Sequence, residues 1–188
     1  MKLHLDRDAF DVFIENIHER CSYRSDVLEK DYYVVLILEE LAKFQKENGL
    51  PAYFKGGTAL YKALKMTNRF SEDIDLSVDT RGMSRSQNDK KLSEATKKYT
   101  VLPREKGITH RSEVITTYIY EPVTNYDTDD SLQRFGRVKI EATSFTIGEP
   151  VTSMEIAPLI YELATKDEKR ILESQYDIKP FEIKTITM

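Results

Sequence analysis

Tryptophan is absent from this sequence, which has only one cysteine, Cys21, and three histidines. A single cysteine cannot form an internal disulfide, and the histidines are too scattered to suggest a zinc site or a histidine base. The sequence also lacks a signal peptide and any apolar run long enough to span a membrane. We therefore expect a protein of the reducing cytoplasm that has no membrane partner.

Excess positive charge is also missing, because the net charge is −4 and the isoelectric point is about 5.5. This balance argues against a general nucleic-acid coat protein. The segment from Arg81 to Arg111 is the exception, with nine Lys or Arg residues against three Asp or Glu residues. Leu92, Ala95 and Tyr99 give it a thin apolar stripe at helical spacing. It is either an ordinary charged helix surface, the commoner case, or a contact for the phosphates of an RNA acceptor.

The 188 residues suffice for a single domain of ordinary size. Besides the basic segment and a short helix after the glycine turn, apolar spacing and turn residues predict helical segments at 6–20, 25–48 and 154–176, the last broken by Pro158. Strands are predicted at 52–55, 73–79, 108–120, 135–143 and 181–187. The pattern predicts an α+β fold with a mixed β-sheet and helices packed on one side. We expect N-terminal helices (1–50), a core sheet (51–150), and a C-terminal helix and strand (151–188).

A glycine turn follows the first predicted strand. Gly56 and Gly57 break this strand and let a ligand approach the main chain. Thr58 suits an N-cap for a helix from Ala59 to about Met66, whose free N–H groups would favour a phosphate at the turn. Lys62, one helical turn later, would add a positive charge.

An acidic strand comes next. Its alternation places Asp73, Asp75, Ser77 and Asp79 on one face and Ile74, Leu76 and Val78 on the other. Neighbouring carboxylates repel one another unless a cation lies between them, and hard oxygen ligands favour Mg²⁺ or Mn²⁺. We therefore predict a divalent metal at Asp73 and Asp75, with a third carboxylate from elsewhere.

The strand at 135–143 has the same design, with Val138, Ile140 and Ala142 on its apolar face. If it lies beside the acidic strand in register, Glu141 completes the metal site and Lys139 faces a triphosphate. The alternative is that Glu141 is an ordinary half-exposed strand glutamate.

Each motif is weak alone, since a Gly-Gly-Thr turn and an Asp-x-Asp strand face are both common. Joined as strand, turn, helix and strand, they favour a nucleotide and metal site. The third glycine of a dinucleotide motif and the Gly-Lys-Ser/Thr ending of a phosphate loop are both absent.

At these residues the sequence resembles a known family. Gly56-Gly57 followed by Asp73-Ile74-Asp75 resembles the signature of DNA-polymerase-β-type nucleotidyltransferases. The longer segments around these motifs, Lys55 to Lys62 and Arg69 to Leu76, are similar to the AbiEii/AbiGii toxin branch of this superfamily. The resemblance implies a nucleotidyltransferase fold with these sites: catalytic and metal-binding Asp73, Asp75 and Glu141, and nucleotide-binding Lys55, Gly56, Gly57, Thr58, Lys62, Arg69 and Lys139.

The resemblance also implies a function and partners. Such a protein moves a nucleoside monophosphate from an NTP to an acceptor hydroxyl, with RNA or tRNA as acceptor, as the toxin of a toxin–antitoxin or abortive-infection pair held by a cognate antitoxin. Two alternatives are the same chemistry on a small molecule or protein side chain, and a nucleotide- or partner-binding module without activity.

Two further features bear on the resemblance. The branch has a Lys-Asp-Tyr motif that Lys30-Asp31-Tyr32 resembles. In this sequence the motif is either an ion pair on the helix surface or a part of the site. Members of the branch usually continue into a C-terminal helical region with a further motif, and nothing of that kind precedes the end of this sequence at Met188. We expect the nucleotidyltransferase core alone, as a piece of a longer chain, a short form or a degenerate one.

Overall fold

The computed structural model describes residues 1–63, 71–105, 113–125, 135–145 and 150–186. Its helices are η1 (Leu3–Leu5), α1 (Arg7–His18), α2 (Ser25–Glu47), α3 (Gly56–Lys62), α4 (Arg85–Lys97), α5 (Leu159–Glu162) and α6 (Lys166–Tyr176). Its strands are β1 (Ala52–Lys55), β2 (Ile74–Asp79), β3 (Glu113–Ile119), β4 (Arg137–Phe145), β5 (Val151–Ile156) and β6 (Phe181–Ile186). The fold is α+β, as the sequence predicted.

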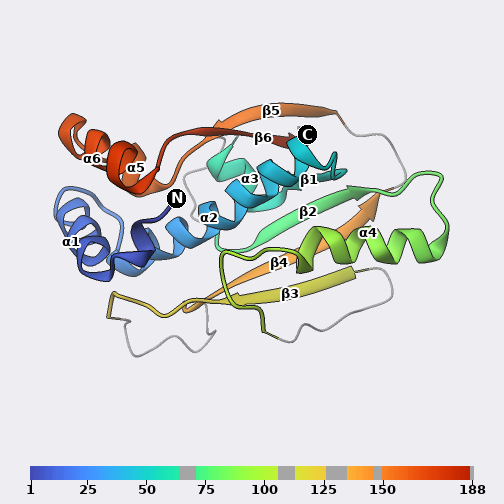
Figure 1. The fold of residues 1–188 in the computed structure, drawn as a ribbon, viewed down its shortest axis with the longest axis horizontal. Coiled ribbons are helices and arrows are strands. Elements are labelled where there is room, and N and C mark those ends of the chain that lie inside the picture. The colour runs from blue at the N-terminus through green and yellow to red at the C-terminus, as the bar shows by residue number, and fades with distance from the viewer. Residues whose placement is uncertain (64–70, 106–112, 126–134, 146–149, 187–188) are drawn as a thin grey trace.

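The six strands form one mixed sheet in the order β3-β4-β2-β1-β6-β5 (Figure 1). β2 pairs with β4 and β1 with β6 in parallel, while the other three neighbouring pairs are antiparallel. The apolar faces predicted for β2 and β4 are buried, from Ile74 to Val78 and from Val138 to Ala142. The prediction was wrong for Ser77. The strand alternation placed it on the open face, but its side chain is buried.

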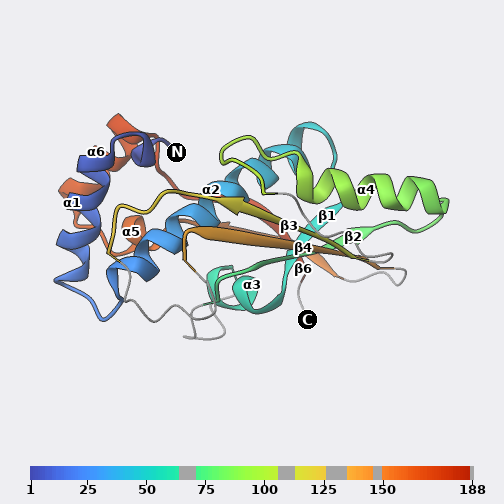
Figure 2. The ribbon, with the colours of Figure 1, turned by 90° about the horizontal axis from the view of Figure 1, so that it is seen from below.

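The helices divide between the two faces of the sheet, which corrects the prediction that they pack on one side. Figure 2 shows α2 and α4 on one side and the short α3 on the other. Helices α1, α5 and α6 gather at one end of the molecule, close to the N-terminus (Figure 1). None of the helices that the structure describes combines the length and apolarity needed to cross a bilayer.

The predicted helix from Met154 is wrong at its start. Residues 151–156 form β5, an edge strand antiparallel to β6 in which Met154 lies opposite Ile183. Every second residue of β5 before Ile156 is exposed, a strand alternation too short to outweigh the helical pattern after it. The helical part begins beyond Pro158 and is divided into α5 and α6, the latter opened by a capping box between Thr165 and Glu168.

Helix α2 carries buried charges where the sequence suggested polar flanks. Glu29, Lys30 and Asp31 are all almost completely buried. Glu29 accepts hydrogen bonds from the backbone N–H groups of Val123 and Thr124. Lys30 donates to the carbonyl of Arg137 at the start of β4. Buried polar groups are stable only when they are paired, and these two side chains find their partners in other segments of the chain. Their hydrogen bonds therefore hold α2 to those segments.

Asp31 binds two other elements. One carboxylate oxygen accepts the backbone N–H of Leu159 at 2.6 Å, and the other lies 2.8 Å from Nζ of Lys62. Asp31 and Lys62 are each 1% exposed. The structure therefore does not support Lys62 as a phosphate ligand, since its charge is used to fasten α3 to α2. The sequence offered two roles for Asp31, a surface ion pair on the helix or a part of the site. Neither is correct, because its ion pair is buried in the interior.

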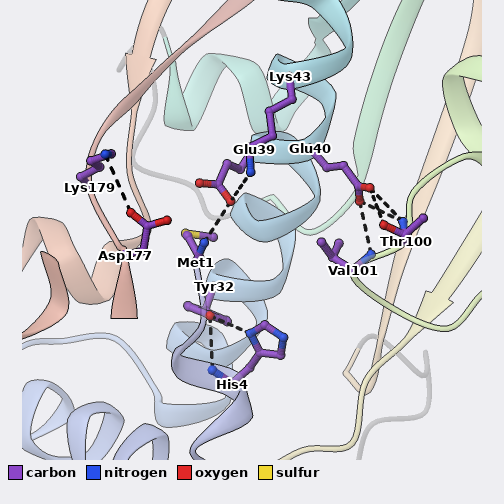
Figure 3. Close-up of polar contacts among 10 residues, drawn as sticks. All are labelled: Met1, His4, Tyr32, Glu39, Glu40, Lys43, Thr100, Val101, Asp177 and Lys179. Carbon is purple, nitrogen blue, oxygen red and sulfur yellow. Dashed lines mark hydrogen bonds and ion pairs between the residues drawn. The ribbon is translucent and has the colours of Figure 1, made fainter. Parts of the chain in front are cut away.

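Further polar contacts hold the second half of α2 (Figure 3). Glu39 pairs with the amino group of Met1 at 3.1 Å, and Glu40 accepts the backbone N–H of Thr100 at 2.9 Å. Gln45 donates to Ala52 of β1 at 2.7 Å and accepts the N–H of Lys184 of β6 at 2.9 Å. Helix α2 is thus fixed to the sheet, the N-terminus and the segment after α4.

The Asp31–Lys62 pair yields a stability prediction. We expect Lys62→Met to lower the free energy of unfolding by about 3–5 kcal/mol, because it leaves a buried carboxylate without its counter-ion. Lys91→Met is the matched control, since Lys91 pairs with Glu94 at the same 2.8 Å but on the surface. We expect it to cost less than about 1 kcal/mol. Urea denaturation measures both values, and equal small losses would contradict the fastening role.

Candidate active site

Gly56 fixes how closely the glycine turn approaches β2. Its φ is +76°, in the left-handed region that glycine adopts without a steric penalty. A Cβ there would lie 2.9 Å from both Cβ and Cγ of Asp75, and closer still to a carboxylate oxygen. The turn and the Asp75 side chain are therefore in direct contact, and only a residue without a side chain fits between them.

Thr58 is not an N-cap, and this prediction was wrong. Helix α3 already begins at Gly56, so Thr58 is its third residue, and the helix has no side-chain cap. The buried hydroxyl of Thr58 lies 2.9 Å from Oγ of Ser71 and donates to the carbonyl of Asp73. The sequence pattern did not single out Ser71. Thr58 therefore holds α3 against the segment that leads into β2.

Three neighbouring strands place charged residues in one row. In the parallel β2–β4 pair Asp75 lies opposite Glu141, and in the antiparallel β1–β2 pair Lys55 lies opposite Asp75. The condition set by the sequence, that the acidic strand and the strand of Glu141 be neighbours in register, is met. Because side chains alternate along each strand, Asp75 and Glu141 point to the same face.

The electrostatics of the row are strained by like charge. Burial raises the pKa of Asp75, and the nearby carboxylates of Glu141 and Asp73 raise it further. The ammonium groups of Lys55 and Lys139 lower it in part. An added cation would therefore be attracted to this face.

Two lysines from the predicted nucleotide-binding set also lie here. Nζ of Lys139 is 3.0 Å from a carboxylate oxygen of Asp73 and 4.0 Å from one of Glu141. The hydrogen bond to Asp73 is the largest cause of a raised pKa at Lys139, so its ammonium stays charged. Lys55 donates to the hydroxyl of Thr143 at 2.8 Å.

The donor set suits a hard divalent ion, because Asp73, Asp75 and Glu141 offer only carboxylate oxygens. Within the described part of the chain, however, no three acidic, histidine or cysteine side chains gather closely enough to hold a metal ion. The carboxylate of Asp73 instead contacts Lys139. The chemistry of the residues fits Mg²⁺ or Mn²⁺, and the assignment of the three carboxylates as its ligands stays a prediction.

The remaining predicted residues are not brought into the row. Arg69 lies outside the described residues. The basic helix is present as α4, in which Leu92 and Ala95 of the predicted apolar stripe are buried; Tyr99 is also buried but follows the end of the helix. Helix α4 packs on the face of the sheet opposite α3 (Figure 2), so its charges are not beside the carboxylates.

The contact between Gly56 and Asp75 yields a second prediction. We expect Gly56→Ala to lower the free energy of unfolding by about 2–4 kcal/mol, because it adds a clash to the strain of a positive φ. Gly49→Ala is the matched control, since Gly49 has a φ of +60° and open space around its Cβ position. We expect it to cost only about 1 kcal/mol. Thermal or urea unfolding measures both, and similar losses would show that the approach to Asp75 carries no steric cost.

Comparison with known proteins gives one family. A family model described as "Nucleotidyl transferase AbiEii toxin, Type IV TA system" matches residues 36–187, from the middle of α2 to the end of β6. No curated protein matches the chain. The matched range includes the glycine turn, the acidic strand and Glu141, and it covers most of the chain. The protein therefore belongs to the AbiEii family, the nucleotidyltransferase toxins of type IV toxin–antitoxin systems.

Proposed function

We propose that this protein transfers a nucleoside monophosphate from an NTP to a hydroxyl group of an RNA acceptor, using a divalent metal held by Asp73, Asp75 and Glu141. The observation that supports this is the row itself, in which Asp75 lies opposite Glu141 on adjacent parallel strands and touches Gly56. A nucleotide phosphate and a metal-binding carboxylate pair need that proximity.

The roles of the residues follow from their chemistry. Gly56 and Gly57 let the triphosphate approach the main chain, and Lys55 and Lys139 supply positive charge on the same face. Bound Mg²⁺ or Mn²⁺ would neutralise the triphosphate and favour ionisation of the acceptor hydroxyl. Thr58 acts by holding the turn in place, and Arg69 stays a proposed phosphate contact from the motif alone.

The transfer is an in-line displacement. Glu141 accepts the proton of the acceptor hydroxyl, whose oxygen forms a bond to the α-phosphorus. The bond from that phosphorus to the bridging oxygen breaks, and pyrophosphate leaves with the electron pair. Lys55 and Lys139 stabilise the negative charge that develops on the leaving group.

The acceptor and the setting are proposed from the family. A toxin with this chemistry that acts on RNA, with tRNA as the first candidate, would arrest growth, and a cognate antitoxin in the same cytoplasm would counter it. In this proposal the basic surface of α4, across the sheet from the carboxylates, contacts the phosphates of such an RNA. Incubation with a labelled NTP and either tRNA or the protein alone separates RNA transfer from self-modification.

The proposed metal site yields a third prediction. We expect Asp75→Asn to keep the fold, with an unchanged or higher melting temperature without metal, because it preserves shape and removes repulsion between carboxylates. We expect it to lose Mg²⁺-dependent NTP binding by at least about tenfold, since one hard ligand is gone. Thermal shift and calorimetry with each NTP, with and without Mg²⁺, measure both effects.

Asp79→Asn is the matched control. Asp79 lies on the same strand at its far end, where it pairs with Arg81 at 2.6 Å. The Asp79→Asn substitution removes the same charge as Asp75→Asn. We expect the affinity for NTP to stay within about twofold of the unaltered chain, because a charge at the far end of the strand is screened. A large loss of stability in Asp75→Asn would make this carboxylate structural. Metal-independent NTP binding in both variants would refute the metal site.

A further inference from the structure

Lys139 has a position among the carboxylates that its proposed role in phosphate binding does not explain. Its ammonium lies 3.0 Å from Asp73 and 4.0 Å from Glu141. These two residues are both assigned to the proposed metal site. The side chains are between 29% and 45% exposed, so water and ions can reach all three.

The strand geometry explains why the ammonium lies there. Lys139 and Glu141 are two residues apart on β4 and therefore share a face. Ile74 of β2 lies opposite Ile140 of β4, and Asp73 and Lys139 each come one residue earlier. Lys139 is thus beside Asp73 across the strands and beside Glu141 along its own strand.

The position of Asp73 in the described structure agrees with this arrangement. Its carboxylate contacts Lys139, and no three acidic side chains of the described residues gather closely enough to hold a metal. A divalent ion bound by Asp73 and Glu141 would lie within a few ångströms of the ammonium. At that distance the two positive charges repel each other, even in a partly solvated site.

We propose that Lys139 is a resident counter-ion of the metal-free site, which a divalent ion must displace from Asp73 in order to bind. The inference rests on the proposed function, since it takes Asp73 and Glu141 as metal ligands. The displaced ammonium then stays on the same face as Lys55, where a triphosphate can accept its hydrogen bonds. Metal entry and phosphate recognition are thereby coupled through one side chain.

The test measures the affinity of the whole chain for Mn²⁺ alone, without nucleotide. We expect Lys139→Met and Lys139→Gln to bind Mn²⁺ about tenfold more tightly than the unaltered chain, because both the competing ion pair and the repulsion are removed. Lys139→Arg keeps the charge and should bind within about twofold of the unaltered chain. Two neutral variants guard against a defect specific to one side chain.

Lys55→Met is the matched control for general charge. Lys55 lies opposite Asp75 in the same row, but its ammonium donates to the hydroxyl of Thr143. Removing it lowers the positive charge by the same amount and leaves the Lys139–Asp73 contact intact. We expect its Mn²⁺ affinity to change by less than about threefold.

Thermal unfolding supplies a second readout that needs no catalysis. Without metal, Lys139→Met should melt below the unaltered chain, because Asp73 and Glu141 lose the ammonium that lies between them. Saturating Mn²⁺ should raise its melting temperature by more than it raises that of the unaltered chain, as tighter binding to the folded state requires.

The outcomes separate the two proposals. If the unaltered chain binds Mn²⁺ and the neutral Lys139 variants bind it equally or more weakly, the counter-ion role is wrong while the metal site stands. If none of the proteins binds Mn²⁺, the metal site itself is refuted and the counter-ion role with it. An equal gain in Lys55→Met and Lys139→Met would reduce the effect to general charge and overturn the specific role of Lys139.

Discussion

The ion pair between Asp31 and Lys62 is the constraint on which the position of the candidate site depends. Helix α3 has only seven residues, too few to be stable alone. It is held at one end by Lys62, buried against Asp31 of α2, and near the other by the hydroxyl of Thr58 on Asp73. Together these contacts hold α3 in the position in which Gly56 lies against Asp75. The candidate site thus depends on a buried ion pair with α2, the helix that also contacts the N-terminus and the sheet.

Buried charges are costly, and α2 has three in succession. Each has a partner in a different element: Glu29 in the segment after β3, Lys30 at the start of β4, and Asp31 in both α3 and α5. An apolar helix face would bury equally well but would accept several rotations against the sheet. Directional hydrogen bonds and ion pairs accept only one, and that fixes α2 relative to the strands that carry the carboxylates.

Sequence patterns predicted what depends on local alternation and turn chemistry. The buried faces of β2 and β4 were predicted from two short alternating segments. The register that places Glu141 beside Asp75 was only a condition in that prediction, because alternation does not say which strands pair, and the sheet meets it. The errors have three causes. Glu29 to Asp31 look solvated because their partners lie far along the chain, and Lys62 looks like a phosphate ligand because its partner precedes it by 31 positions. Thr58 resembles an N-cap because the pattern does not show that glycine itself starts the helix. Strand β5 has too few residues to outweigh the helix that follows, and it forms because β6 offers an edge.

The row of Lys55, Asp75 and Glu141 is drawn from β1, β2 and β4, of which the last two join in parallel although much of the chain separates them. No local segment can form this row before the sheet is assembled, because a parallel pair needs a long crossover. The charged side chains themselves contribute little to that assembly, since they lie on the open face while Ile74, Leu76 and Ile140 fill the core. In β2 and β4, therefore, the apolar residues of one face stabilise the fold, and the charged residues of the candidate site lie on the opposite face. Among the described helices, α3 contacts both the candidate site, through Gly56 at Asp75, and the interior, through Lys62 at Asp31. We therefore expect substitutions in α3 to change stability and the proposed nucleotide binding together.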